Sequence, residues 1–170
     1  AFICGSVLAG RFNHNPPVPP LTRFLPAEAD TLAFGAALVP CLKPGLVVYL
    51  SGELGAGKTT LARGILRELG YTGNVKSPSF ALVELYKVSR LYLYHFDFYR
   101  FDDPRELGEA GFREHFGPDA VCLVEWPENA AGALPPADIR IEMKIAGTGR
   151  HVEMHADTES GRLCLERFEH

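Results

Sequence analysis

Apolar residues recur along this chain with two periods, one helical and one strand-like. A spacing of three and four residues predicts a helix beginning near Pro26 and another over 60–69, and Pro40 should bend or shorten the first. Residues 103–116 form a polar stretch with helical character, and the alternation at 163–165 suggests a short strand. Longer alternating or apolar runs predict strands over these segments: 46–50, 80–87, 91–99, 120–126 and 139–154.

Two parts of this pattern predict antiparallel hairpins. The strands at 80–87 and 91–99 are joined by only three residues, and the strand beginning at Ile139 turns back through Gly147-Thr148-Gly149. A doubly wound domain would alternate strands and helices throughout. We therefore predict a single α/β domain whose central sheet mixes parallel and antiparallel strands and is flanked by helices.

The composition is typical of one globular domain. Its 170 residues are 46% hydrophobic and 22% charged, and no apolar run approaches the roughly 20 residues of a membrane-spanning helix. We expect residues 1–25 to be a flexible extension, because they are rich in proline and their apolar start lacks the basic residues of a signal peptide. Four scattered cysteines indicate reduced thiols in a cytoplasmic protein, and the net charge of −4 argues against a freestanding nucleic-acid binder.

Residues 52–59 read Gly-Glu-Leu-Gly-Ala-Gly-Lys-Thr and lie between a predicted strand and a predicted helix. This is the phosphate-binding loop pattern. Its glycines allow successive N–H groups to turn toward a phosphate, and Lys58 adds a positive charge. Thr59 offers a hydroxyl to Mg²⁺, and the helix that follows directs its positive end at the same site. The predicted nucleotide-binding residues are Gly52, Glu53, Leu54, Gly55, Ala56, Gly57, Lys58, Thr59 and Thr60.

Hydrolysis needs two further groups, a carboxylate that orients the metal and a group that places the attacking water. Glu125 ends an apolar strand and is the best candidate for the metal, although it could be an ordinary strand-end carboxylate. Asp97 lies on a mixed strand face, where an unpaired charge is costly to bury. It could serve the metal or a water, or pair with Arg100 or His95.

Other residues have a simpler interpretation beside the functional one. The hydroxyls of Ser77 and Ser79 could approach a terminal phosphate, yet serines are common in turns. Trp126 could fill the core or pack against the nucleotide, and we include it among the predicted nucleotide-binding residues. No Asn-Lys-x-Asp segment is present to select guanine, so we expect ATP. The predicted catalytic residues are Lys58, Asp97 and Glu125.

Four segments, in this order, resemble the TsaE (YjeE) family of ATPases, which serve bacterial tRNA threonylcarbamoyladenosine synthesis. They are residues 50–60, Lys76-Ser77-Pro78-Ser79-Phe80, Tyr94-His95-Phe96-Asp97-Phe98-Tyr99-Arg100 and Val124-Glu125-Trp126-Pro127-Glu128. The last two are the discriminating ones, because many families share the loop. The resemblance covers about residues 26–150, with Ser79 where many members have threonine.

The resemblance implies a P-loop ATPase domain, here expected over residues 26–170, that binds ATP and Mg²⁺ and hydrolyses slowly on its own. Family members work with the TsaD and TsaB proteins, which attach a threonylcarbamoyl group to an adenosine beside the tRNA anticodon. By position, it implies phosphate and metal roles for Lys58 and Thr59, a metal role for Glu125, and a catalytic or metal-shell role for Asp97. Contact with tRNA would be indirect, and no membrane is implied.

Two alternatives from other classes stay open on the sequence. A small-molecule kinase would share the loop but usually carries an arginine-rich lid, and residues 103–116 contain only Arg105 and Arg113. A non-catalytic nucleotide switch would bind ATP without depending on Asp97 or Glu125 for its function.

Overall fold

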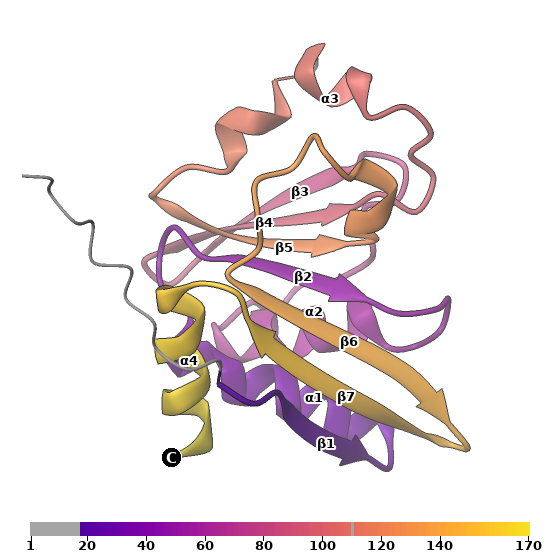
Figure 1. The fold of residues 1–170 in the computed structure, drawn as a ribbon, viewed down its shortest axis with the longest axis vertical. Helices are drawn as coiled ribbons and strands as arrows, with labels where there is room; N and C mark the ends of the chain where they lie inside the picture. The colour runs from indigo at the N-terminus through magenta and orange to yellow at the C-terminus, as the bar shows by residue number, and fades with distance from the viewer. Residues whose placement is uncertain (1–17, 110) are drawn as a thin grey trace, which may run out of the picture.

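A computed structural model describes residues 18–109 and 111–170, so the expectation for the first 17 residues lies outside the described range. The described chain forms a sheet with strand order β1-β7-β6-β2-β5-β4-β3 (Figure 1). The strands are β1 (Leu21–Leu25), β2 (Val47–Ser51), β3 (Val83–Val88), β4 (Leu91–Asp97), β5 (Ala120–Glu125), β6 (Ile139–Ala146) and β7 (Gly149–Ala156).

The predicted mixed sheet is confirmed. Its centre is parallel, because β2 pairs in parallel with β5 and β6, and β5 pairs in parallel with β4. Both predicted hairpins are antiparallel, β3 with β4 and β6 with β7. The carboxyl ends of β2, β5 and β4 therefore meet at one edge of the sheet, the edge where ligands bind in open α/β folds.

The start of the folded domain was predicted too late. Residues 21–25, expected as part of a flexible extension, form β1 and pair antiparallel with β7. Leu21 and Leu25 are buried at its two ends. The pairing partner is β7, far along the chain, so the local proline-rich sequence carries no sign of it.

The strand predicted at 163–165 is wrong, because these residues lie in helix α4 (Glu159–Glu169). The Thr158 hydroxyl accepts a hydrogen bond from the Gly161 N–H at 3.1 Å and so caps the first turn. Leu165 is buried whereas Leu163 is exposed, although strand alternation would place both on one face.

Helices cover both faces of the sheet (Figure 1). One face carries α1 (Glu28–Leu38), α2 (Lys58–Glu68) and α4, and a short 3₁₀ turn (Val39–Cys41) that contains Pro40 ends α1 as predicted. The other face carries α3 (Arg105–Glu109) and a 3₁₀ turn (Phe112–His115), so the helix predicted over 103–116 is broken. Gly111, at φ +72°, opens the second piece. None of the helices in the described ranges is long and apolar enough to cross a membrane.

The two faces of β4 divide the core between the two helical layers. Leu93 packs with the core that includes Leu61 and Ile65 of α2, whereas Phe96, together with Phe98 just after the strand, packs with Leu107 of α3. This confirms the two-residue alternation predicted for 91–99. It also places His95 and Asp97 on the face that looks toward α2, where the phosphate loop ends.

Helices α1 and α2 cross where each carries a glycine. A Cβ on Gly35 would lie 2.3 Å from the Leu61 carbonyl oxygen, and one on Gly64 would lie 2.3 Å from the Leu32 carbonyl oxygen. Backbone atoms of two packed helices cannot move aside cheaply. This close approach fixes how α2, and with it the loop at its start, sits over the sheet.

We expect Gly64→Ala to destabilise the protein by about 1–3 kcal/mol or more through overpacking, although alanine gains up to about 1 kcal/mol in helix propensity. Urea unfolding measures the free-energy change. Gly108→Ala in α3 is the matched control, because an added Cβ there meets nothing within 4 Å, and it should leave stability equal or higher. A Gly64→Ala protein as stable as the wild type would contradict the close helix crossing.

Candidate functional site

The predicted phosphate loop lies between the end of β2 at Ser51 and the start of α2 at Lys58. Gly55 and Gly57 have φ values of +81° and +103°, which only glycine adopts without strain. A Cβ on Gly52 would lie 2.4 Å from the Met143 carbonyl oxygen of β6. The glycine pattern is therefore required by the loop's own conformation and by its contact with the neighbouring strand.

A cavity of about 570 Å³ opens beside this loop at the carboxyl edge of the sheet. Six of the nine binding residues predicted in the segment 52–60 line it: Leu54, Gly55, Gly57, Lys58, Thr59 and Thr60. Across from them it is lined by Asp97, Glu125 and Trp126. The three remaining predicted loop residues, Gly52, Glu53 and Ala56, are not part of its lining.

Strand register brings the two predicted carboxylates together. Asp97 and Glu125 are paired residues at the ends of the parallel strands β4 and β5, and Glu125 is in turn paired with Leu50 of β2. Both carboxylates are almost completely buried, at 3% and 2% exposure. They are 28 positions apart in the chain (125 − 97), yet they line one cavity beside the loop.

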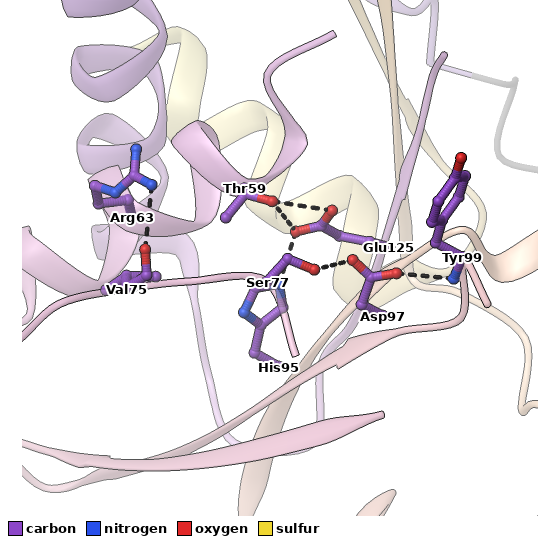
Figure 2. Close-up of polar contacts among 8 residues, drawn as sticks. All are labelled: Thr59, Arg63, Val75, Ser77, His95, Asp97, Tyr99 and Glu125. Atoms are coloured by element: carbon purple, nitrogen blue, oxygen red, sulfur yellow. Dashed lines mark hydrogen bonds and ion pairs between the residues drawn. The ribbon is translucent and has the colours of Figure 1, made fainter. Parts of the chain in front are cut away.

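Glu125 is held from two sides (Figure 2). The Thr59 hydroxyl donates to its carboxylate, with distances of 2.9 and 3.2 Å to the two oxygens. His95 Nε2 lies 2.8 Å from Oε1 of the same carboxylate, and His95 itself is fully buried. From the sequence, His95 was predicted only as a possible pairing partner of Asp97. Its place two residues before Asp97, on the same strand face, was the signal that it belongs to the site.

Asp97 is held by different groups (Figure 2). The Ser77 hydroxyl donates to Oδ2, and the Tyr99 N–H donates to Oδ1 at 2.8 Å. Ser77 itself follows a segment fixed by Arg63 of α2, whose guanidinium donates to the Val75 carbonyl oxygen at 3.1 Å. The segment at 77–79 is therefore part of the site, since both of its serines line the cavity.

The alternative pairing of Asp97 with Arg100 or His95 is not seen among the described contacts. The Arg100 guanidinium, which also lines the cavity, instead lies over the Phe80 ring, 4.2 Å from its centroid. Phe80 is 82% exposed. Arg100 therefore stacks on an exposed ring instead of pairing with Asp97.

Lys58 and Trp126 form the third part of the site. The Lys58 ammonium donates to the carbonyl oxygens of Gly52 and Glu53, the latter at 3.0 Å, and lies 4.2 Å from the centroid of the Trp126 ring. Burial lowers the pKa of Lys58, and the carboxylates of Glu125, Glu128, Asp97 and Glu53 oppose that shift. Trp126 has a left-handed backbone, with φ +56°, which turns the chain sharply after Glu125. The Trp126 side chain lines the cavity and also packs against the core on the α3 side of the sheet.

The groups around the cavity are of two chemical kinds. Loop and α2 N–H groups, together with the Lys58 ammonium, suit an anion such as a phosphate chain. The Thr59 hydroxyl and the Glu125 and Asp97 carboxylates are the hard oxygen donors that Mg²⁺ takes. The donor set therefore fits a phosphate-bearing ligand with a divalent cation. An α/β domain with this loop after a central parallel strand, facing carboxylates at the ends of the neighbouring strands, is a P-loop domain.

Comparisons with known proteins narrow this class to one family. The family described as threonylcarbamoyl adenosine biosynthesis protein TsaE matches residues 25–152. A protein of that name from Haemophilus influenzae is 42% identical, over 87% of this chain and 97% of its own length. The Bacillus subtilis protein of that name is 41% identical, over 69% of this chain and 73% of its own length. A crystal structure of Bacillus subtilis YdiB aligns with a TM-score of 0.78 at 31% identity, over 91% of this chain and 97% of that one.

The chain belongs to the TsaE family, which acts in tRNA threonylcarbamoyladenosine biosynthesis. This confirms the resemblance seen in its four sequence segments. The matched range includes the loop, the β4 and β5 carboxylates and the segment at 77–79.

Proposed function

We propose that this chain is a Mg²⁺-dependent ATPase that supports threonylcarbamoyl transfer to tRNA in the cytoplasm. It acts with the TsaD and TsaB proteins and meets tRNA through them. The proposal is carried by one observation: in a TsaE-family chain, the loop, Lys58 and Thr59 share a cavity with two buried carboxylates from adjacent strands. The net charge of −4 supports indirect contact with tRNA.

The roles follow from the contacts of each side chain. The loop N–H groups and the Lys58 ammonium bind the phosphates, and Trp126 keeps the ammonium on the cavity side of the loop. Thr59 and Glu125 would hold Mg²⁺, which would offset negative charge on the phosphate oxygens. His95 keeps the Glu125 carboxylate turned toward Thr59.

Asp97 is the residue we assign to the attacking water. Ser77 and the Tyr99 N–H fix the plane of its carboxylate, so one face of the group is presented to the cavity in a single orientation. A carboxylate fixed in this way can orient a water by accepting its hydrogen bond. Because Asp97 contacts neither Thr59 nor Lys58 among the described hydrogen bonds, its role is separate from the metal role of Glu125.

Slow turnover by the isolated chain follows from the cations around the cavity. Of the described lining residues, only Lys58 and Arg100 carry a positive charge, and Arg100 is stacked on the exposed Phe80 ring. P-loop enzymes gain about 10³–10⁵-fold in rate from an arginine that reaches the transferred phosphate. A partner that supplies or repositions such a group would therefore raise the rate strongly.

We expect ATP hydrolysis by the purified chain to run below about 1 per second alone, under the median enzyme rate, and to rise at least about tenfold with TsaD, TsaB and tRNA. Steady-state release of ADP and inorganic phosphate measures both rates. Equal amounts of the two products separate hydrolysis from a small-molecule kinase, in which the phosphate would be found on a metabolite. Turnover at tens per second without partners would instead indicate a freestanding enzyme.

A further inference from the structure

The guanidinium of Arg150 connects the start of β7 to the phosphate loop. Its Nε donates to the Ala56 carbonyl oxygen at 2.9 Å, and its Nη2 donates to the Gly55 carbonyl oxygen at 3.0 Å. Its Nη1 donates to the Gly149 carbonyl oxygen at 2.8 Å, so the same group is also anchored on β7. The contact joins residues 94 positions apart in the chain.

Arg150 and Lys58 contact different carbonyl oxygens of the loop, those of Ala56 and Gly55 for Arg150 and those of Gly52 and Glu53 for Lys58. Arg150 does not line the cavity that holds Asp97 and Glu125. It lines a smaller one, of about 230 Å³, between the loop, the start of α1 and the β6–β7 turn. The carbonyl oxygens of Gly55 and Ala56 therefore point toward Arg150, whereas the buried carboxylates line the other cavity.

The direction of these carbonyls matters for a phosphate ligand. In a trans peptide the C=O and the following N–H point in opposite directions, so holding the Ala56 carbonyl on the Arg150 side turns the Gly57 N–H away from it. The Ala56 N–H is already used within the loop, where it donates to the Glu53 carbonyl oxygen at 3.0 Å. A carbonyl turned the other way would oppose an anion with its negative end.

We propose that Arg150 is a positioning residue for phosphate binding, holding the loop peptides at 55–57 in the orientation that receives a phosphate. The inference rests on the proposed ATPase function. The side chain is suited to this because a guanidinium presents several donors in one rigid plane, and it can engage two successive carbonyls and its own strand at once. Its base is rigid too, because β7 lies between β1 and β6, with Arg150 paired to Leu25 and Ile145.

The test compares wild type, Arg150→Ala and Arg150→Lys by calorimetric titration with Mg-ATP and, separately, with magnesium and inorganic tripolyphosphate. We expect Arg150→Ala to weaken both ligands by the same factor, about tenfold or more, because two charge-assisted hydrogen bonds are lost. The lysine variant should recover part of this, since an ammonium can reach one carbonyl but lacks the planar fork. In hydrolysis assays KM for ATP should rise by that factor while kcat changes less.

Arg140→Ala is the matched control, because Arg140 lies on the adjacent strand β6 and pairs with Asp157 instead of the loop. It should bind both ligands as the wild type does, and thermal unfolding without ligand checks that each variant is folded. A folded Arg150→Ala protein with unchanged affinities would overturn the positioning role. So would a loss confined to ATP, which would mean that Arg150 contacts the nucleoside through the smaller cavity. A wild type that binds neither ligand would defeat the proposed ATPase function itself.

Discussion

Replacing Lys58 by methionine should reduce partner-stimulated ATP hydrolysis by about 100- to 1000-fold, the loss typical of removing one charge-stabilising group from an active site. Among the described residues that line the cavity, the cationic ones are Lys58 and Arg100, and Arg100 stacks on the exposed Phe80 ring. The Lys58 ammonium is only 4.2 Å from the centroid of the Trp126 ring and is almost fully buried.

The fold should survive this change. Burial lowers the pKa of Lys58, which means that the low-polarity surroundings disfavour its charged form in spite of the nearby carboxylates. Methionine fills a similar volume without a charge, so the melting temperature should stay within a few degrees of wild type. Calorimetric titration with Mg-ATP and phosphate-release assays measure the functional loss. Lys87→Met, at an exposed position of β3, is the control. Near-normal activity of Lys58→Met would remove the basis of the phosphate site.

Replacing Glu125 by glutamine should have the second large effect, a loss of about 100-fold or more in stimulated hydrolysis. Glutamine keeps the shape of the side chain, and its carbonyl oxygen can still accept hydrogen bonds from Thr59 and His95. What it loses is the negative charge that a divalent cation needs. The requirement for Mg²⁺ should therefore rise, and phosphate-release assays over a magnesium titration measure that shift.

The same variant separates an ATPase from a nucleotide switch. If hydrolysis drives the tRNA modification, both should fall together in Glu125→Gln and in Asp97→Asn, measured as modified adenosine in tRNA after incubation with TsaD and TsaB. Glu153→Gln, on the surface of β7 beside His155, should leave both at the wild-type level. Modification that persists while hydrolysis is lost would favour the switch. Survival of both activities in Glu125→Gln and Asp97→Asn would show that the hydrolytic residues are misassigned.

Much of the fold could be predicted because its signals are local. The strand, loop and helix over residues 46–69 follow one another directly, so their sequence signals lie side by side. The two hairpins are also local, because in each of them the paired strands are separated by only a few residues. The incorrect prediction of a strand at 163–165, within α4, overlooked a local helix signal. Thr158 at the cap position and Glu159 in the first turn favour a helix, and the alternation of Leu163 with Leu165 was too short to outweigh them.

The failure to predict strand β1, at one edge of the sheet, has a different cause. Strand β1 has no local signature, because its hydrogen bonds come from β7 and its burial from the assembled core. Arg150 likewise carries no sign of a role in the sequence. It acquires one only when β7 is placed beside the loop, 94 residues away.

The amino-acid order alone determined the chemical parts of the site: the glycines that permit the loop, the ammonium, the hydroxyl and two carboxylates at strand ends. Only the tertiary structure decided which of them meet. The strand order β2-β5-β4 runs against chain order, and it places Glu125 between the loop and Asp97. Distant pairing of this kind depends on the shared core and on backbone hydrogen bonds across the sheet. Neither can be predicted from a short segment of the sequence, because both involve residues far apart in the chain.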